Sequence, residues 1–251
     1  LFAQLPLLYR AYAAASGVEW AAANPLFWGD SGLAVLASGN LADVVAINAG
    51  TGMKLKWAFY LETGRVVEIA GLFLVGMVIQ HRGWFAEAKK RLRLWLGVLA
   101  VSGVVWLIVV QFGPLLLPGE GSPMMQVQSI QWALDQWRAL AATAFQLASF
   151  VLLWITPFQR VLSWLAAPGR MTLTLYVGQS LFAASLLYGF GLGWWDDLTQ
   201  AQLVIAGLVL FALQAWGAAL WYRAYRYGPL EWLWRVATLR SFQVPFRNVR
   251  S

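Results

Sequence analysis

The chain has 251 residues, of which 60% are hydrophobic and only 12% are charged, and its formal net charge is +7. A soluble domain carries roughly 25% charged residues, so this chain has too few of them to cover a surface in water. The high apolar content also argues against a disordered chain. The absence of cysteine excludes disulfides and thiolate ligands, and with a single histidine we expect no metal site. The composition predicts an integral membrane protein.

Five apolar stretches are long enough to cross a bilayer, which takes about 20 mostly apolar residues. In chain order they cover residues 57–80, 94–117, 132–155 (or 139–155), 171–188 and 201–222. Each is too long for an ordinary strand, and none alternates with a period of two. We therefore expect an all-α fold, a polytopic membrane bundle of five transmembrane helices with short interfacial helices beside them.

The basic residues are distributed unevenly over the connections between these stretches. Of the 18 Lys and Arg residues, 13 lie in residues 82–93, in residues 157–170 or in the tail from residue 223, and none lies in residues 118–131 or 190–200. Cytoplasmic loops carry the excess of basic residues, so this pattern predicts a cytoplasmic C-terminus. The positive charge then reflects topology and contact with membrane lipids, and we expect no nucleic-acid partner.

The segments outside the five stretches complete a three-part division. Residues 1–56 are expected to form an extracytoplasmic segment with short interfacial helices, and residues 57–223 the transmembrane bundle. Residues 224–251 are expected to form a cytoplasmic interfacial helix and a basic tail. A chain that begins outside the membrane with no preceding span is topologically awkward, so we expect further helices to precede residue 1 in the full protein.

Three charged residues interrupt the first stretch at spacings of three: Glu62, Arg65 and Glu68. On one continuous helix they would lie on successive turns, with Glu68 roughly 16 Å into the bilayer. In a structural interpretation Arg65 pairs with both carboxylates, which leaves one negative charge and requires another partner. In a functional interpretation the three line a buried polar site or a water-filled cavity, the usual meaning of ionisable groups inside a membrane.

A second polar stripe lies on the fourth stretch, where Tyr176 and Gln179 share one helical side with Thr172 and Ser180. Gln146 in the third stretch and Gln214 in the fifth are single amides in apolar surroundings, where an unpaired amide is costly. We expect both amides to face the same interior as the stripe. The alternative for the stripe is ordinary hydrogen bonding between helices.

Two motifs resemble a known family. The segment GRMTLTLYVGQSL (169–181), followed by YGPLEWLWRVATL (227–239), is similar to the C-terminal signature of the YeiB family of bacterial membrane proteins. The segment LETGRVVEIAGLFLVGMVIQHRGWF (61–85) is similar to that family's preceding helix, so the resemblance covers about residues 57–240. At 173–175 the chain has Leu-Thr-Leu, where many relatives have Asn or Ser before the tyrosine.

The resemblance implies a place in the bacterial cytoplasmic (inner) membrane and a relation to transmembrane acyltransferases. Such enzymes take an acyl group from cytoplasmic acyl-CoA, here a co-substrate and not a resident cofactor, and deliver it to an extracytoplasmic acceptor such as a sugar or a lipid. On this interpretation Glu68 or Glu62 is the catalytic carboxylate, with Arg65 as its partner. The substrate-binding residues would be Arg65, Tyr176, Gln179, Gln146 and Gln214.

The alternative is a protein without catalytic activity. It would either carry a lipid or solute through a cavity lined by the polar groups, or serve as a structural or accessory subunit of a larger membrane complex. A homo-oligomer is compatible with each of these functions.

Overall fold

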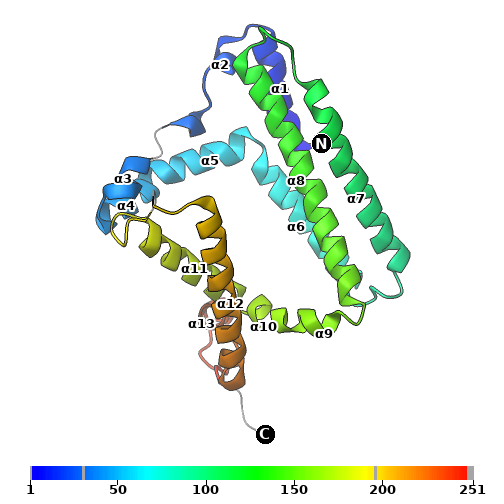
Figure 1. The fold of residues 1–251 in the computed structure, drawn as a ribbon, viewed down its shortest axis with the longest axis vertical. Coiled ribbons are helices and arrows are strands. Elements are labelled where there is room, and N and C mark those ends of the chain that lie inside the picture. The colour runs from blue at the N-terminus through cyan, green and yellow to red at the C-terminus, as the bar shows by residue number, and fades with distance from the viewer. Residues whose placement is uncertain (1, 30–31, 195–196, 248–251) are drawn as a thin grey trace. The chain divides into compact units, whose positions relative to one another are not determined.

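The computed structural model describes residues 2–29, 32–194 and 197–247. Over these residues every regular element is a helix (Figure 1), and the only β-type pairing is an isolated antiparallel bridge between Tyr225 and Arg247. The predicted all-α class is therefore confirmed for the described part of the chain.

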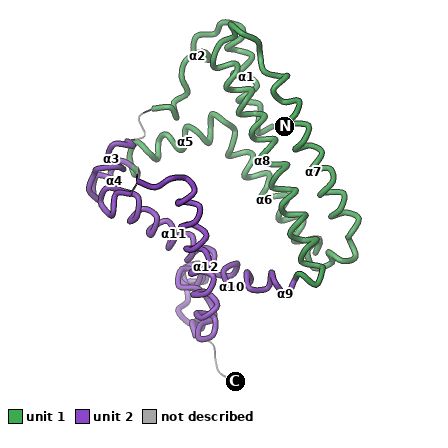
Figure 2. The backbone as a smooth tube through the Cα atoms, in the orientation of Figure 1, with its two compact units in different colours: residues 1–31, 48–158 green, residues 32–47, 159–251 purple. Residues whose placement is uncertain are grey.

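Contacts divide the chain into two compact units, coloured separately in Figure 2. Unit 1 comprises residues 1–31 and 48–158, and unit 2 comprises residues 32–47 and 159–251. This division follows packing. The predicted division at residues 56 and 223 instead separates the transmembrane bundle from the segments on either side of it, and it stays a prediction.

Unit 1 is built on a pair of long antiparallel helices, α7 and α8, with the N-terminal helix α1 packed along α8. Its elements are the 3₁₀ helix η1 (Phe2–Gln4), α1 (Leu5–Ala15), α2 (Glu19–Ala22), the 3₁₀ helix η2 (Leu26–Trp28), the π-helix η3 (Asn48–Gly52), α5 (Met53–Glu62), α6 (Arg65–His81), α7 (Leu92–Phe112), the 3₁₀ helix η4 (Gly113–Leu116) and α8 (Met124–Trp154).

Small side chains let these helices approach closely. Ala14 and Ala21 pack with Met125 at the start of α8, and Trp95 packs with Ala148 near the other end of the α7–α8 pair. Small residues at helix contacts are the usual means of packing in a membrane, where Leu gains little by leaving lipid. Most other large apolar side chains of the pair stay exposed, as expected for helices surrounded by lipid.

Unit 2 contains one long helix, α12, and a set of shorter ones. Its elements are α3 (Leu33–Ser38), α4 (Leu41–Ile47), α9 (Gln159–Leu162), the 3₁₀ helix η5 (Ser163–Leu165), α10 (Ala166–Arg170), α11 (Thr172–Leu187), α12 (Gln200–Ala224) and α13 (Pro229–Leu239). A capping box between Thr199 and Gln202 starts α12. After α13 the chain folds back, and the ring of Phe246 packs on those of Trp221 and Tyr225.

In the described part of the chain, three helices are long and apolar enough to cross a membrane: α7 with η4 (Leu92–Leu116), α8 and α12. They correspond to the second, third and fifth predicted spans, which indicates a membrane protein with several spans. The predicted count of five is not confirmed, because α6 has 17 residues and α11 has 16, both short of a clear span.

The first predicted span is wrong as a single helix over residues 57–80. The chain breaks between α5 and α6 at Thr63 and Gly64, where Gly64 takes a left-handed φ of +70°. Glycine adopts this conformation without steric cost. Glu68 consequently lies in the first turn of α6 and not several turns into a continuous helix, so the depth predicted for it no longer follows.

Candidate functional site

Glu62, at the end of α5, is neutralised by Arg10 of α1. The Arg10 guanidinium donates to Glu62 Oε2 at 3.3 Å, and the backbone N–H of Leu26 donates to Glu62 Oε1 at 3.2 Å. Arg10 also donates to the carbonyl oxygens of Ala21 and Ala23. Its side chain is only 11% exposed, so this ion pair joins α1, α2 and α5 inside unit 1.

Arg65 pairs with Glu68 alone, through an Nη1–Oε2 distance of 3.4 Å. The predicted triad with Arg65 at its centre is therefore wrong, because the break at Gly64 places Glu62 on a different helix. The prediction that the surplus negative charge needs a further cation is correct, and Arg10 is that cation. Glu68 is nearly buried at 8% exposure, whereas Arg65 is 37% exposed, so the second pair lies at the edge of the protein.

The helix break is held by α8. Gln136 Nε2 donates to the carbonyl oxygen of Thr63 at 2.8 Å, and both residues are buried. Two further polar atoms of α8, Gln136 Oε1 and Ser129 Oγ, are buried without a hydrogen-bond partner among the described residues. Buried polar groups are seldom left unpaired, so these two atoms make this face of α8 a polar part of the unit 1 interior.

Three of the predicted substrate-binding residues meet in one pocket of unit 2, between α11 and α12. Tyr176, Gln179 and Gln214 line it with Thr172 and Phe211, and its volume is about 440 Å³. Gln214 is half-buried and donates to the carbonyl oxygen of Leu175 at 3.4 Å. We call this space the amide pocket.

Gln146 lies elsewhere. It lines a groove of about 590 Å³ on the α7–α8 pair of unit 1, with Gly103, Trp106 and Phe145. Gln146 and Gln214 line different pockets, one in each unit, and the expectation that they face one shared interior stays a prediction. The carboxylates Glu62 and Glu68 belong to unit 1, whereas the residues of the amide pocket belong to unit 2.

The start of α11 is held by a carboxylate from α13. Glu231 Oε1 accepts the backbone N–H groups of Leu173 at 2.7 Å and Thr174 at 3.1 Å, and Oε2 accepts the Thr174 hydroxyl at 2.5 Å. Thr174 Oγ1 in turn accepts the N–H of Leu230, in the first turn of α13. Each helix thus caps the other, and we call this arrangement the α11–α13 clasp.

Gly228 allows the clasp to form. A Cβ atom there would overlap Glu231 Oε2 and crowd Met171 and Thr174. Tyr222 of α12 adds a hydrogen bond of 2.9 Å from its hydroxyl to the carbonyl oxygen of Arg170. The two segments that carry the sequence resemblance, 169–181 and 227–239, are therefore bonded directly to each other.

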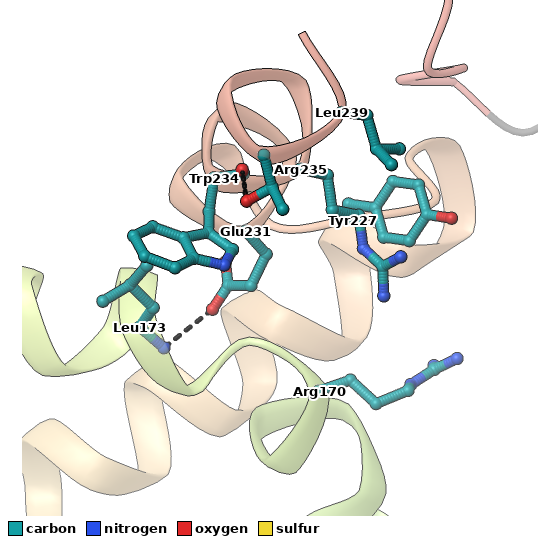
Figure 3. Close-up of a pocket in the computed structure, with 8 residues that line it drawn as sticks. Arg170, Leu173, Tyr227, Glu231, Trp234, Arg235 and Leu239 are labelled. Atoms are coloured by element: carbon teal, nitrogen blue, oxygen red, sulfur yellow. Dashed lines mark hydrogen bonds between the residues drawn. The ribbon is translucent and has the colours of Figure 1, made fainter. Parts of the chain in front are cut away.

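A second pocket of unit 2, of about 580 Å³, opens beside the clasp (Figure 3). It is lined by Arg170, Leu173, Tyr227, Glu231, Trp234, Arg235, Thr238 and Leu239. The Arg235 guanidinium lies 4.6 Å from the centre of the Tyr227 ring, and that of Arg170 lies 4.2 Å from the Tyr222 ring. We call this space the arginine pocket.

Arg170 and Arg235 entered the sequence-based expectations only as indicators of topology, so the arginine pocket was not predicted. These expectations also missed Arg10, whose pairing with Glu62 joins residues 52 positions apart. Among the described residues no three His, Asp or Glu side chains gather as a metal site would require. The site residues can therefore donate hydrogen bonds from amide, phenol and guanidinium groups, and they include two carboxylates that are each paired with an arginine.

The family described as "Protein of unknown function (DUF418)" matches residues 79–241. YeiB of Escherichia coli strain K12 is 28% identical over 197 residues, which are 69% of this chain and 45% of YeiB. YxaH of Bacillus subtilis strain 168 is 39% identical over 88 residues, 35% of this chain and 22% of YxaH. Both relatives are described as uncharacterized proteins.

A 39.9 kDa protein of Bacillus acidopullulyticus, also described as uncharacterized, is 35% identical over 104 residues, 41% of this chain and 30% of that protein. The chain thus spans less than half the length of each of these relatives. No solved structure matches it.

Proposed function

The chain belongs to the DUF418 family, which includes YeiB-like bacterial proteins, and from this premise we propose that it acts as a membrane acyltransferase. The donor is cytoplasmic acyl-CoA, and the acceptor is an extracytoplasmic sugar or lipid. The protein resides in the bacterial inner membrane with its C-terminus in the cytoplasm, as the distribution of Lys and Arg favours.

The observation that carries this proposal is the amide pocket. The side chains of Tyr176, Gln179 and Gln214 bring a phenol and two amides together on helices that are otherwise mostly apolar. Polar side chains inside a membrane are costly and usually mark the path or site of a substrate. Their O–H and N–H groups are suited to bind acceptor hydroxyls and to stabilise the oxyanion of an acyl-transfer intermediate.

The reaction needs a base, and Glu68 fits that role better than Glu62. Both oxygens of Glu62 accept hydrogen bonds, from Arg10 and from Leu26, which ties this carboxylate to the structure. Among the described residues Glu68 pairs with Arg65 alone, and the partial exposure of Arg65 leaves the pair accessible. A carboxylate in such a setting can take a proton at the moment of attack.

In the proposed step the acceptor hydroxyl gives its proton to the base, and its oxygen forms a bond with the carbonyl carbon of the thioester. The carbon–sulfur bond then breaks and the thiolate of coenzyme A takes up the proton. The products are an ester and free coenzyme A, so no oxidant or reductant is consumed.

The proposal includes the five-span topology. With about 1.5 Å of rise per residue, the 17 residues of α6 cover about 25 Å, near the lower limit for a span. None of the residues of α6 or α11 is buried by the protein, which leaves their apolar side chains available to lipid.

Release of coenzyme A tests the proposal directly. The chain has no cysteine, so a thiol reagent added to the purified full chain reports only the coenzyme A set free. We expect palmitoyl-CoA to be consumed when the chain is reconstituted in Escherichia coli lipid vesicles with glucose present. Absence of release above protein-free vesicles would overturn the proposed function.

Variants locate the reacting groups. We expect Glu68→Gln to slow release by roughly a hundredfold or more, as for loss of a general base, and Tyr176→Phe by about tenfold. Glu87→Gln, on an exposed turn, serves as the matched control and should keep the full rate. An unchanged rate in Glu68→Gln would remove Glu68 from the mechanism.

One observation favours the alternative of an accessory subunit in a larger membrane complex. A groove of about 790 Å³ runs along α6 between Ile69 and His81, and it is lined almost wholly by apolar side chains. Such a face suits a neighbouring helix from another protein or from a second copy. Mild detergent extraction followed by mass analysis of the intact assembly distinguishes a partner, a homo-oligomer and a monomer.

A further inference from the structure

Two guanidinium groups of the arginine pocket have no carboxylate partner among the described residues. Arg170 and Arg235 each stack on a tyrosine ring, of Tyr222 and Tyr227, and neither forms an ion pair with another described residue. Cation–π stacking orients a guanidinium and leaves its N–H groups free to donate. Figure 3 shows both groups on the Tyr227 side of the pocket.

The one carboxylate in the pocket is already occupied. Glu231 turns toward Leu173 (Figure 3), and its two oxygens accept three hydrogen bonds from the start of α11. The partial positive charge of that helix end compensates its negative charge. An anion entering the pocket therefore meets two guanidinium groups, while the carboxylate of the lining is hydrogen-bonded to the start of α11.

The rest of the lining is apolar and open. The side chains of Trp234, Leu239 and Leu173 are 68%, 62% and 40% exposed. Leu233, next to Trp234 in α13, is 54% exposed, so this apolar stripe of Leu233, Trp234 and Leu239 does not pack against the protein. An amphipathic helix with such a stripe is typical of the membrane interface.

We propose that the arginine pocket binds the phosphate of an acyl-bearing phosphate ester, with the guanidinium groups of Arg170 and Arg235 on the phosphate and the Trp234 face along the acyl chain. Guanidinium groups donate paired N–H bonds that match phosphate oxygens. A volume of about 580 Å³ lies within the range of small-molecule sites.

Two sources share this chemistry, an acyl-CoA and an anionic phospholipid. The inference does not require the acyl transfer proposed above. Binding of either ligand without release of coenzyme A would leave the site standing and overturn the proposed function alone.

The test is ligand binding to the full chain, purified in a neutral detergent and followed by native mass spectrometry. The phosphate-bearing probes are palmitoyl-CoA and dioleoylphosphatidylglycerol, and dioleoylglycerol is the probe without phosphate. The variants are Arg170→Gln, Arg235→Gln and the double variant. Arg223→Gln is the matched control, because it removes the same charge from the end of α12 and does not line the pocket.

We expect at least one phosphate-bearing probe to bind more tightly than dioleoylglycerol, and the tighter of the two identifies the source. Each single variant should weaken binding about tenfold, the double variant about a hundredfold, and Arg223→Gln less than twofold. Because Gln shortens the side chain, Arg170→Lys is added, and it should recover part of the affinity through its charge.

Three results would overturn the inference. The first is equal binding of dioleoylglycerol, and the second is wild-type affinity in the double variant. The third is a loss in Arg223→Gln as large as in the pocket variants, which would indicate attraction by net charge alone. Near-ultraviolet circular dichroism of each variant separates loss of the ligand site from loss of the fold.

Discussion

Glu62 in unit 1 and Glu231 in unit 2 both join segments that are distant in sequence, but they are neutralised in different ways. Glu62 is held by the guanidinium of Arg10 and one backbone N–H. Glu231 is held by backbone N–H groups and the hydroxyl of Thr174, with no cation from the described part of the chain. Unit 1 therefore uses its buried cation for its own structure, whereas unit 2 keeps Arg170 and Arg235 available for a ligand.

The largest expected effect is on the helix break that separates Glu62 from Arg65. Gly64→Ala places a Cβ atom against the carbonyl oxygen of Ala3 at a left-handed φ of +70°. We expect a loss of about 4 kcal/mol in the free energy of unfolding, measured by thermal melting in detergent. The control is Gly71→Ala, where a Cβ atom has open space. Equal melting temperatures for the two variants would contradict the left-handed turn.

Next in size is the ion pair of unit 1. Arg10→Met leaves Glu62 charged and largely buried, which we expect to cost about 3 kcal/mol. Adding Glu62→Gln removes the unpaired charge and should restore part of the loss. The control, Arg138→Met, breaks a pair with Asp135 whose side chains are about half exposed, and should cost less than about 1 kcal/mol. A cost for Arg10→Met no larger than for the control would show that the pair is not buried.

The clasp of unit 2 should be weaker, because it contains no ion pair. Glu231→Ala is expected to cost about 2 kcal/mol, and Thr174→Val about 1 kcal/mol. Since the two residues share hydrogen bonds, the double variant should cost less than the sum of the single variants. Thr238→Val, which removes a hydroxyl bonded within its own helix, is the control. If the cost of the double variant equals the sum of the two single costs, Glu231 and Thr174 act independently of each other.

The smallest expected effect concerns the ion pair of Glu87, which is exposed, whereas the ion pair of Glu62 is largely buried. Hydrogen bonds and charge from Lys90, then from Arg91, hold the pKa of Glu87 below its ordinary value of 4.5. A carboxylate whose pKa is lowered in the folded protein stabilises the fold at pH values above its ordinary pKa. This contribution is lost as the pH falls through the lowered pKa. We expect the melting temperatures of Glu87→Gln and the wild type to differ slightly at pH 7, equally at pH 5, and to converge below pH 4. A difference that changes between pH 5 and pH 8 would implicate another group.

The sequence was sufficient for the features that depend on local pattern. Long apolar runs predicted α7 with η4, α8 and α12 to within two residues at every end except the start of α8, which lies eight or more residues before the predicted start. Helical spacing placed Tyr176 beside Gln179. The break at Gly64 was missed because apolar membrane helices tolerate glycine, so its left-handed conformation has no clear local signal. The pairing of Arg10 with Glu62 depends on the fold and not on spacing, and only the imbalance of charge around Arg65 pointed to it.

The clasp limits where the chain can be shortened or joined to a reporter. Since Glu231 supplies the acceptors for Leu173 and Thr174, the first turn of a helix is completed by a residue almost sixty positions later. Shortening the gene from its 3′ end past that codon would leave α11 with open amides at its start. A reporter fused beyond residue 247 should preserve the protein, whereas one inserted before Glu231 should yield a chain that proteases degrade.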